Sequence, residues 1–240
     1  MLVGGVLLGV AGGQGVQAYR GNDEGEPGVY LGIIGFSDAL DVKEIERLTP
    51  GNQRSFEQKI DNLRLGRSTA LYYAIDHAVR RMETAELPDD LSSVTLVTFT
   101  DGFDNISTLF QDAKRETGRA YEDYISNLLS SSSVHGVELR AYSIGLIGEE
   151  MMGDGEATVL KFKRMLRSIS SSSDLAVPIT RKELAWVFAG VAEDMQDTMP
   201  AKQGSALVML VLDCSGSMLA SLEALKIVAK QFVEILAEGK

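Results

Sequence analysis

ALVMLVLDCSGSM, residues 206–218, is the stretch that decides the fold, because it leads from a buried strand into a helix. Residues 206–212 form a continuous apolar run, which is typical of a strand that is covered on both faces. The segment that follows, from about Leu219 to Glu238, has apolar residues at helical spacing. These residues are Leu222, Leu225, Ala229, Phe232 and Leu236. A buried strand followed directly by an amphipathic helix indicates an α/β fold.

Strands and helices alternate along the rest of the chain. Apolar runs bounded by turn residues predict strands at 29–36, 39–48, 93–100, 137–146 and 175–179. Helical spacing predicts helices at 52–63, 68–82, 120–129, 159–169 and 181–199. We expect Ser68 to cap the second of these helices, and the serine-rich stretches at 130–133 and 170–173 to be loops. The alternation predicts a Rossmann-like, doubly wound fold with a mostly parallel central sheet flanked by helices.

Composition narrows the class of protein. The chain has 240 residues, of which 45% are apolar and 24% charged, the balance of a globular domain. Its net charge of −11 argues against a nucleic-acid partner, because phosphate binding needs concentrated Lys and Arg. Cys214 is the only cysteine, so no intrachain disulfide can form, and we expect it to be a small buried residue. With only His77 and His135 to join it, a Cys/His zinc site is nearly excluded.

Residues 1–28 form a glycine-rich segment whose role the sequence leaves open, and we assign the folded domain to residues 29–240. Met1 to Ala11 is apolar, but it is shorter than the roughly 20 residues needed to cross a bilayer. No other segment could span a membrane. The apolar start favours the bacterial envelope or secretion over the cytoplasm without deciding between them.

Three turns rich in oxygen donors are expected at one edge of this sheet. Asp213, Ser215 and Ser217 follow the strand at 206–212, Asp101 follows the strand at 93–100, and Thr69 lies at the start of a helix. In open α/β sheets, ligands bind beyond the carboxyl ends of the strands. Carboxylates and hydroxyls are the ligands of a hard divalent cation, so these residues are candidate metal ligands.

Each of these residues also has a simpler interpretation. Asp213, Ser215 and Ser217 could cap the following helix, Thr69 could be an ordinary helix N-terminal hydroxyl, and Asp101 an ordinary turn residue before Gly102. Asp104 and Asn105 are interpreted as turn formers, and Asp38 could fall near the same edge of the sheet. Agreement among three separate segments favours metal binding over these local roles.

The three segments LVLDCSGSM (210–218), LGRSTALYYAI (65–75) and TLVTFTDGFDN (95–105) resemble a von Willebrand factor type A domain with a metal-ion-dependent adhesion site. GIIGFSDAL (32–40) and residues 171–195 are also similar to that family. The resemblance implies that Mg²⁺ or Mn²⁺ is held by Asp213, Ser215, Ser217, Thr69 and Asp101. It further implies a non-enzymatic adhesion or interaction module, in which an acidic side chain of a protein partner completes the coordination of the metal.

The order of the segments departs from that family, whose members begin with the Asp-x-Ser-x-Ser strand. Here residues 29–199 correspond to the second strand onward, and residues 206–240 to the first strand and first helix. One explanation is circular permutation, with the linker at 200–205 joining the former ends. The other is an incomplete domain joined to the start of a second copy, which would allow a strand-swapped homodimer. We favour permutation, because residues 29–199 contain no other candidate for the central strand.

Three other functions compete with the adhesion site as interpretations of the sequence. GQGVQA at 13–18 imitates a dinucleotide-binding motif, but Gly21, Gly25 and Pro27 would break the helix that this motif requires. Ser215 lies on a strand-to-helix turn, as a hydrolase nucleophile would, but its flanks lack the G-x-S-x-G pattern. A metal-independent scaffold module is the third alternative, and the sequence does not separate it from metal-dependent adhesion.

Overall fold

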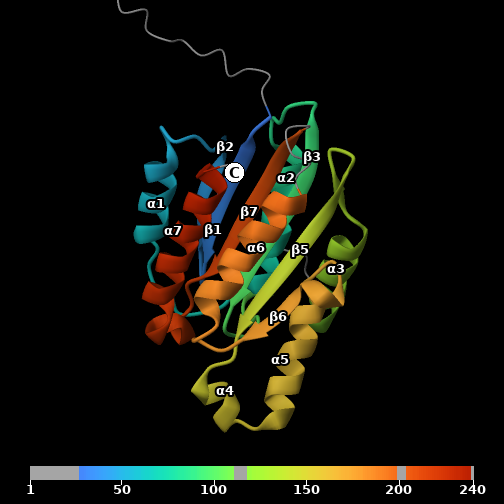
Figure 1. Cartoon of the computed structure of the whole chain (residues 1–240). Helices are drawn as coiled ribbons and strands as arrows, with labels where there is room; N and C mark the ends of the chain where they lie inside the picture. Colours follow the sequence, from blue (N-terminus) through green and yellow to red (C-terminus); the bar gives the residue numbers. More distant parts are fainter. Residues whose placement is uncertain (1–26, 111–117, 199–203, 239–240) are drawn as a thin grey trace, which may run out of the picture.

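A central sheet organises the molecule, as the computed structural model in Figure 1 shows. The structure describes residues 27–110, 118–198 and 204–238. In spatial order, the first five strands are β2 (Leu40–Arg47), β1 (Val29–Phe36), β7 (Ser205–Asp213), β3 (Leu91–Thr100) and β5 (Val137–Leu146). Two short strands also pair with β5, namely β4 (Ser133–Val134) and β6 (Ala176–Ile179).

Strand β7 is the centre of this sheet, and all nine of its residues are buried. It pairs in parallel with β1 on one side and with β3 on the other, so that Leu210 lies opposite both Ile33 and Val97. The β3–β5 and β5–β6 pairs are also parallel, whereas β2 runs antiparallel to β1 at the edge. The predicted mostly parallel sheet is confirmed, and the stretch that comes late in the sequence is its central strand.

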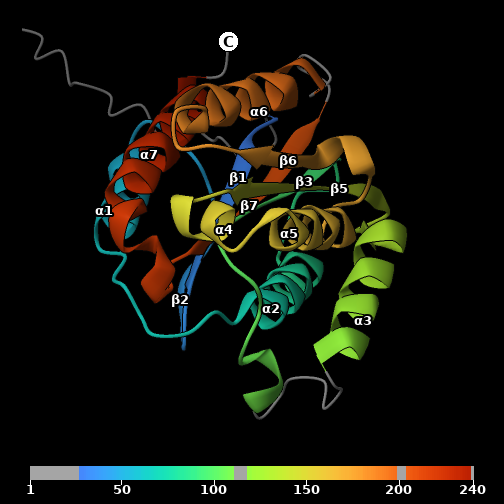
Figure 2. The same cartoon turned by 90° about the horizontal axis from the view of Figure 1, so that it is seen from below.

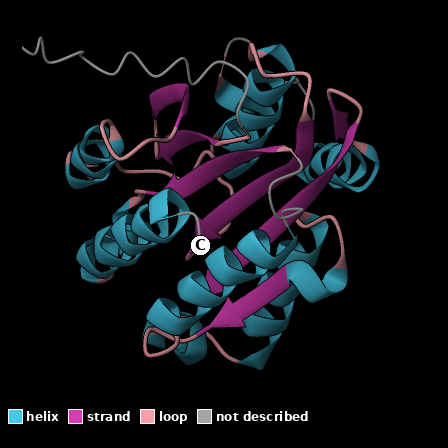
Figure 3. Ribbon diagram, turned by 45° about the horizontal axis from the view of Figure 1, so that its top comes forward, coloured by secondary structure: helices cyan, strands magenta, loops and turns pink. Residues whose placement is uncertain are grey.

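Helices cover both faces of the sheet, as Figures 2 and 3 show from two further directions. One face packs against α1 (Gln53–Asp61), α6 (Leu184–Thr198) and α7 (Leu222–Glu238). The opposite face packs against α2 (Leu71–Thr84), α3 (Gly118–Ser131) and α5 (Glu156–Ser168). Alternate residues of β7 point to the two layers: Val208 and Leu210 contribute to the first core, and Leu207 and Met209 to the second.

The apolar faces expected from helical spacing are buried. All five residues named above for the last helix, from Leu222 to Leu236, have exposed fractions of 6% or less. Burying a side chain of this kind contributes roughly 1.5–3 kcal/mol each. The two helix layers are therefore held mainly by the periodic apolar residues that predicted them.

Two predictions about serine residues are wrong. Ser68 does not cap α2, which begins at Leu71 after Ala70 and has no capping side chain of its own. Ser131 ends α3, and Ser133 pairs with Glu138 in strand β4, so residues 130–133 are not a loop. A tight turn at His135 and Gly136, with φ values of 51° and 82°, joins β4 to β5. Because serine is common both in helix ends and in turns, composition alone placed these boundaries wrongly.

The start of several other elements also differs from the prediction. A short helix, α4 (Glu149–Gly153), precedes α5, which begins at Glu156 rather than 159. Leu175 lies in a 3-10 turn, η2 (Ser173–Leu175), so β6 begins at Ala176. Another 3-10 turn, η3 (Gly216–Ala220), lies between β7 and α7, which therefore begins at Leu222 instead of Leu219. These short turns have no apolar periodicity by which they could be recognised.

Several sequence features fall outside the described residues. They are the apolar stretch 1–11, the dinucleotide-like motif 13–18, and most of the linker, residues 200–203. Within the described residues, no helix has both the length and the apolar character required to cross a bilayer.

Candidate metal site

The two strand ends that carry carboxylates lie side by side, because β7 and β3 are neighbours in the sheet. The chain leaves β7 toward α7 on one face and leaves β3 toward α3 on the other face. Asp213 and Asp101 therefore lie where the connections of adjacent strands diverge. In doubly wound sheets, this divergence opens a crevice in which ligands bind.

Asp213 is completely buried and held by two hydrogen bonds. The backbone N–H of Ser215 donates to Asp213 Oδ1 at 2.7 Å, and the Thr100 hydroxyl donates to Asp213 Oδ2 at 2.6 Å. Burial raises the pKa of Asp213 above its ordinary value, although both hydrogen bonds act in the opposite direction. The orientation of this carboxylate is therefore determined by its own turn and by the end of β3.

The serine hydroxyls point to one another and to Asp101 instead of capping a helix. Ser215 Oγ and Ser217 Oγ are 2.9 Å apart, and the Ser217 hydroxyl donates to Asp101 Oδ1 at 2.5 Å. Ser215 precedes η3 without forming a side-chain cap. Ser215 therefore does not act as a helix cap, and the two hydroxyls are instead linked to each other and to Asp101.

Asp101 lies in an unfavourable environment for its negative charge. Burial, followed by the nearby charge of Asp213, raises the pKa of Asp101 to about 7, whereas the Ser217 hydrogen bond acts to lower it. In the described residues, no lysine or arginine forms an ion pair with either carboxylate. Two neighbouring carboxylates without a cationic side chain fit the binding of a metal cation.

Thr69 is placed by a loop, residues 66–70, that docks against β1 and β7. The N–H of Gly66 donates to the carbonyl of Cys214 at 2.8 Å, and the N–H of Arg67 donates to Asp38 Oδ1 at 3.0 Å. A Cβ atom on Gly66 would lie 2.1 Å from Ser37 Oγ, so only glycine allows this close approach. Asp38 does lie at this edge of the sheet, and its role here is to hold the loop.

The Thr69 hydroxyl completes the group of candidate ligands. Thr69 is 5% exposed, and its hydroxyl forms no hydrogen bond with any described residue. A Cβ atom on Gly102 would lie 4.0 Å from Thr69 Oγ1 and 3.8 Å from Ser217 Oγ, so the two hydroxyls flank Gly102. The structure thus brings the three sequence-distant segments together around one point.

The donor set contains two carboxylates and three hydroxyls, which suits a hard cation such as Mg²⁺ or Mn²⁺. Nowhere in the described part of the chain do three or more His, Cys, Asp or Glu side chains form a group that could hold a metal. A cation at this position would therefore depend on the hydroxyls of Ser215, Ser217 and Thr69 as well as on the two aspartates.

Sequence reasoning missed two further residues at this site. Thr100 holds Asp213 through its hydroxyl, and Asn105 forms hydrogen bonds with the backbone of Thr69. The sequence alone predicts only a turn-forming role for Asn105. The available signal was that Thr100 directly precedes Asp101 and that Asn105 lies in the turn after it, at the end of a predicted strand.

The cysteine and the two histidines of the chain are not among the candidate metal ligands. Cys214 is 3% exposed, and burial raises the pKa of its thiol to about 12, so the thiol stays protonated. His77 accepts a hydrogen bond from Arg81 Nε at 2.8 Å within α2. His135 is exposed at the β4–β5 turn, where its Nε2 lies 3.1 Å from the carbonyl of Met82.

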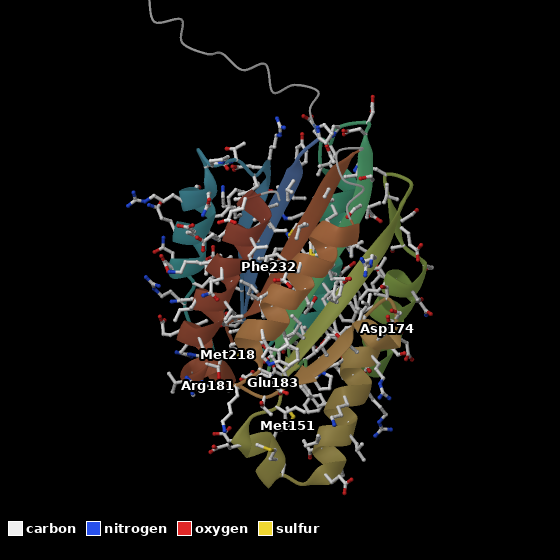
Figure 4. The ribbon with its side chains drawn as sticks, in the orientation of Figure 1. Met151, Asp174, Arg181, Glu183, Met218 and Phe232 are labelled. Carbon is white, nitrogen blue, oxygen red and sulfur yellow. The ribbon has the colours of Figure 1, made fainter. Side chains whose placement is uncertain are left out.

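A groove of about 890 Å³ begins at Asp101 and Ser217 and continues between α4 and residues 180–182. Figure 4 shows Met151, Arg181, Glu183 and Met218 gathered at this end of the molecule. Leu219, which follows Ser217 by two positions in η3, has 74% of its surface exposed. The candidate metal site is therefore the end of an open surface groove.

Neither a protein-family model, nor a curated protein, nor a solved structure matches this chain.

Proposed function

We propose that this chain is a divalent-metal-dependent protein-binding module of the von Willebrand factor A type. The observation that carries the proposal is that oxygen donors from three distant segments converge at the carboxyl ends of the central strands. The residues that would hold Mg²⁺ or Mn²⁺ are Asp213, Ser215, Ser217, Thr69 and Asp101. When bound there, the ion supplies an open coordination position that a carboxylate from outside the chain can fill.

The strand order supports a circularly permuted form of that family's fold. If β7 is counted as the first strand and the two-residue strand β4 is left out, the order from β2 through β1, β7, β3 and β5 to β6 reads 3-2-1-4-5-6. This strand order is characteristic of doubly wound α/β sheets. In Figure 1, the C-terminal end of α7 and the start of β1 lie at the same end of the sheet, where the unpermuted connection would run. β7 can fill the central position within one chain, as permutation requires.

The groove beside the site gives a partner a surface on which to bind. An acidic side chain placed on the metal would let neighbouring residues of the partner contact Met151 and Met152 of α4. Arg181 and Lys182 also line the groove, so the partner would meet charged groups there too. We assign no catalytic role to these residues, and the proposed activity is binding.

The decisive experiment is a titration of the metal-free chain with Mn²⁺ and Mg²⁺, followed by thermal unfolding. A native-state ligand raises stability by RT ln(1 + [L]/Kd), so the Tm should rise with the logarithm of the metal concentration once it exceeds Kd. Ser217→Ala should reduce this rise, and because Ser217 is exposed, the variant should still fold. Asp213→Ala should abolish it. A cooperative transition that does not respond to either metal would refute the proposed site.

A second measurement separates adhesion from the metal-independent scaffold. The probe is a short synthetic peptide, acetyl-Gly-Glu-Gly-amide, with the glutamine peptide as its control. We expect the glutamate peptide to bind the Mn²⁺-loaded chain more tightly than the glutamine peptide, and neither to bind in EDTA. If the metal binds but the two peptides behave alike, the ion has only a structural role and the scaffold alternative is favoured.

A further inference from the structure

We infer that Asn105 is the positioning residue for Thr69, and that its side chain sets the affinity of the metal site without binding the metal. This inference rests on the proposed function, because it concerns one of the five proposed ligands. Asn105 is exposed and follows Asp101 by four positions, and it is separated from Thr69 by 36 positions.

Asn105 holds the backbone of Thr69 on both sides of its Cα atom. Asn105 Oδ1 accepts a hydrogen bond from the N–H of Thr69 at 2.9 Å. The N–H of Asn105 donates to the carbonyl of Thr69 at 3.0 Å. Two hydrogen bonds of opposite direction restrict both peptide groups that flank Thr69, and therefore restrict where its Cβ and hydroxyl can lie.

Apart from the N–H of Ala70, which donates to the carbonyl of Ser37 at 3.0 Å, the loop that contains Thr69 has no device of its own that would do the same. Helix α2 follows at once, but Ala70 at its N-terminus has no side-chain acceptor for the free N–H groups of the first turn. The acceptors come instead from the segment after Asp101. Tyr72 N donates to Asp104 Oδ1 at 3.3 Å, and Tyr73 N donates to Ser107 Oγ at 2.8 Å.

The segment after Asp101 and the loop that contains Thr69 therefore form one hydrogen-bonded unit, in which residues 104–107 hold the start of α2. Asp104 and Ser107 stabilise the helix, whereas Asn105 alone in this segment bonds the backbone of a proposed ligand. Residues that orient metal ligands typically change metal affinity by about 10- to 100-fold when they are substituted. We expect a loss in this range for Asn105→Ala.

The test compares three variants with the wild-type chain in two measurements. Asn105→Ala removes the side-chain acceptor, and Asn105→Asp retains an oxygen that can accept from Thr69 N. Ser107→Ala is the matched control, because it removes an acceptor from the same helix end without contacting Thr69. The measurements are the Mn²⁺ dissociation constant by calorimetry, and hydrogen exchange of the Thr69 amide by NMR in the metal-free state.

The expected pattern is specific to positioning. Asn105→Ala should bind Mn²⁺ at least tenfold more weakly and lose protection of the Thr69 amide, whereas Asn105→Asp should restore the protection and bind at least as tightly as wild type. Ser107→Ala should lower the Tm but keep the dissociation constant within about twofold of wild type, since its effect is confined to capping.

Two results would overturn the inference while leaving the proposed function in place. One is a wild-type dissociation constant in Asn105→Ala, and the other is an equal loss of affinity in Asn105→Ala and Ser107→Ala. Failure of the wild-type chain itself to bind Mn²⁺ is a different outcome, because it refutes the proposed metal site.

Discussion

The hydroxyl of Ser217 donates a hydrogen bond of 2.5 Å to Asp101 Oδ1, although the two residues are 116 positions apart in the chain. Ser217 belongs to η3, after the central strand β7, and Asp101 follows β3. The pair can form only when β7 lies beside β3. The candidate site is thus linked to the docking of the central strand, and a ligand that binds there should stabilise the whole sheet.

The first prediction concerns the hydroxyl of Thr100, which bonds the buried Asp213. Thr100→Val keeps the shape of the side chain but leaves a buried carboxylate oxygen without its donor, which costs about 1–3 kcal/mol. We expect a loss of this size in urea unfolding of the metal-free chain. Thr98→Val is the control, because the Thr98 hydroxyl is buried without a hydrogen-bond partner in the described structure. It should be neutral or stabilising, and equal losses in both variants would contradict the prediction.

Asp101→Asn should stabilise the metal-free chain at pH 8 while removing its response to Mn²⁺. The folded pKa of Asp101 is about 7, above the value of 3.8 for an ordinary aspartate, so the folded state holds its proton more tightly. Wild-type stability should therefore fall as the pH rises from about 4 to about 7, and remain low above that range.

The asparagine has no charge to lose, so this part of the pH dependence should be weaker in the variant. We expect a Tm increase of a few degrees at pH 8 in EDTA, because about 1 kcal/mol corresponds to roughly 2–4 °C in a chain of this size. Thermal unfolding at pH 5 and pH 8 measures the effect. If the variant is less stable than wild type at pH 8, burial and the charge of Asp213 do not make the ionised form of Asp101 unfavourable in the folded state.

Gly102→Ala should weaken metal binding with little change in folding. The new methyl would lie 3.8 Å from Ser217 Oγ and 4.0 Å from Thr69 Oγ1, which are ordinary contacts, but it would occupy the space between the two hydroxyls. We expect a stability change within about 0.5 kcal/mol, as for other changes without clashes, and a several-fold higher Mn²⁺ dissociation constant. Gly148→Ala, at a groove position where a Cβ meets nothing within 4 Å, should bind Mn²⁺ like wild type.

Strand β7 should be indispensable for cooperative folding. A chain that ends at residue 198 lacks the only strand that pairs with both β1 and β3 in the described structure. We expect this fragment to show no cooperative thermal transition by circular dichroism, and to regain one when a peptide of residues 204–240 is added. A cooperative transition of the fragment alone would show that β1 and β3 can close the sheet without β7, and would weaken the case for permutation.

The two helix layers could be predicted because their determinants are local. The apolar spacing of 219–238 identifies the buried side of α7, and the run 206–212 identifies a strand covered on both faces. The start of α2 could not be predicted in this way. Its capping acceptors, Asp104 and Ser107, lie 32 and 34 positions from the N–H groups that donate to them. Local sequence contains no sign of such distant partners, and it therefore wrongly favours Ser68 as the cap.

The sequence by itself determined which oxygen donors follow the strands, and the structure adds which of them meet. Asp213, Ser215, Ser217, Thr69 and Asp101 were all identifiable as candidates, and their binding of a metal stays a prediction. Only the tertiary structure decided that Ser217 contacts Asp101, that Asp38 holds the loop before Thr69, and that Asn105 bonds Thr69 itself. The physical reason is that hydrophobic spacing specifies the buried face of each element, whereas contacts between strand ends depend on which elements become neighbours when the sheet assembles.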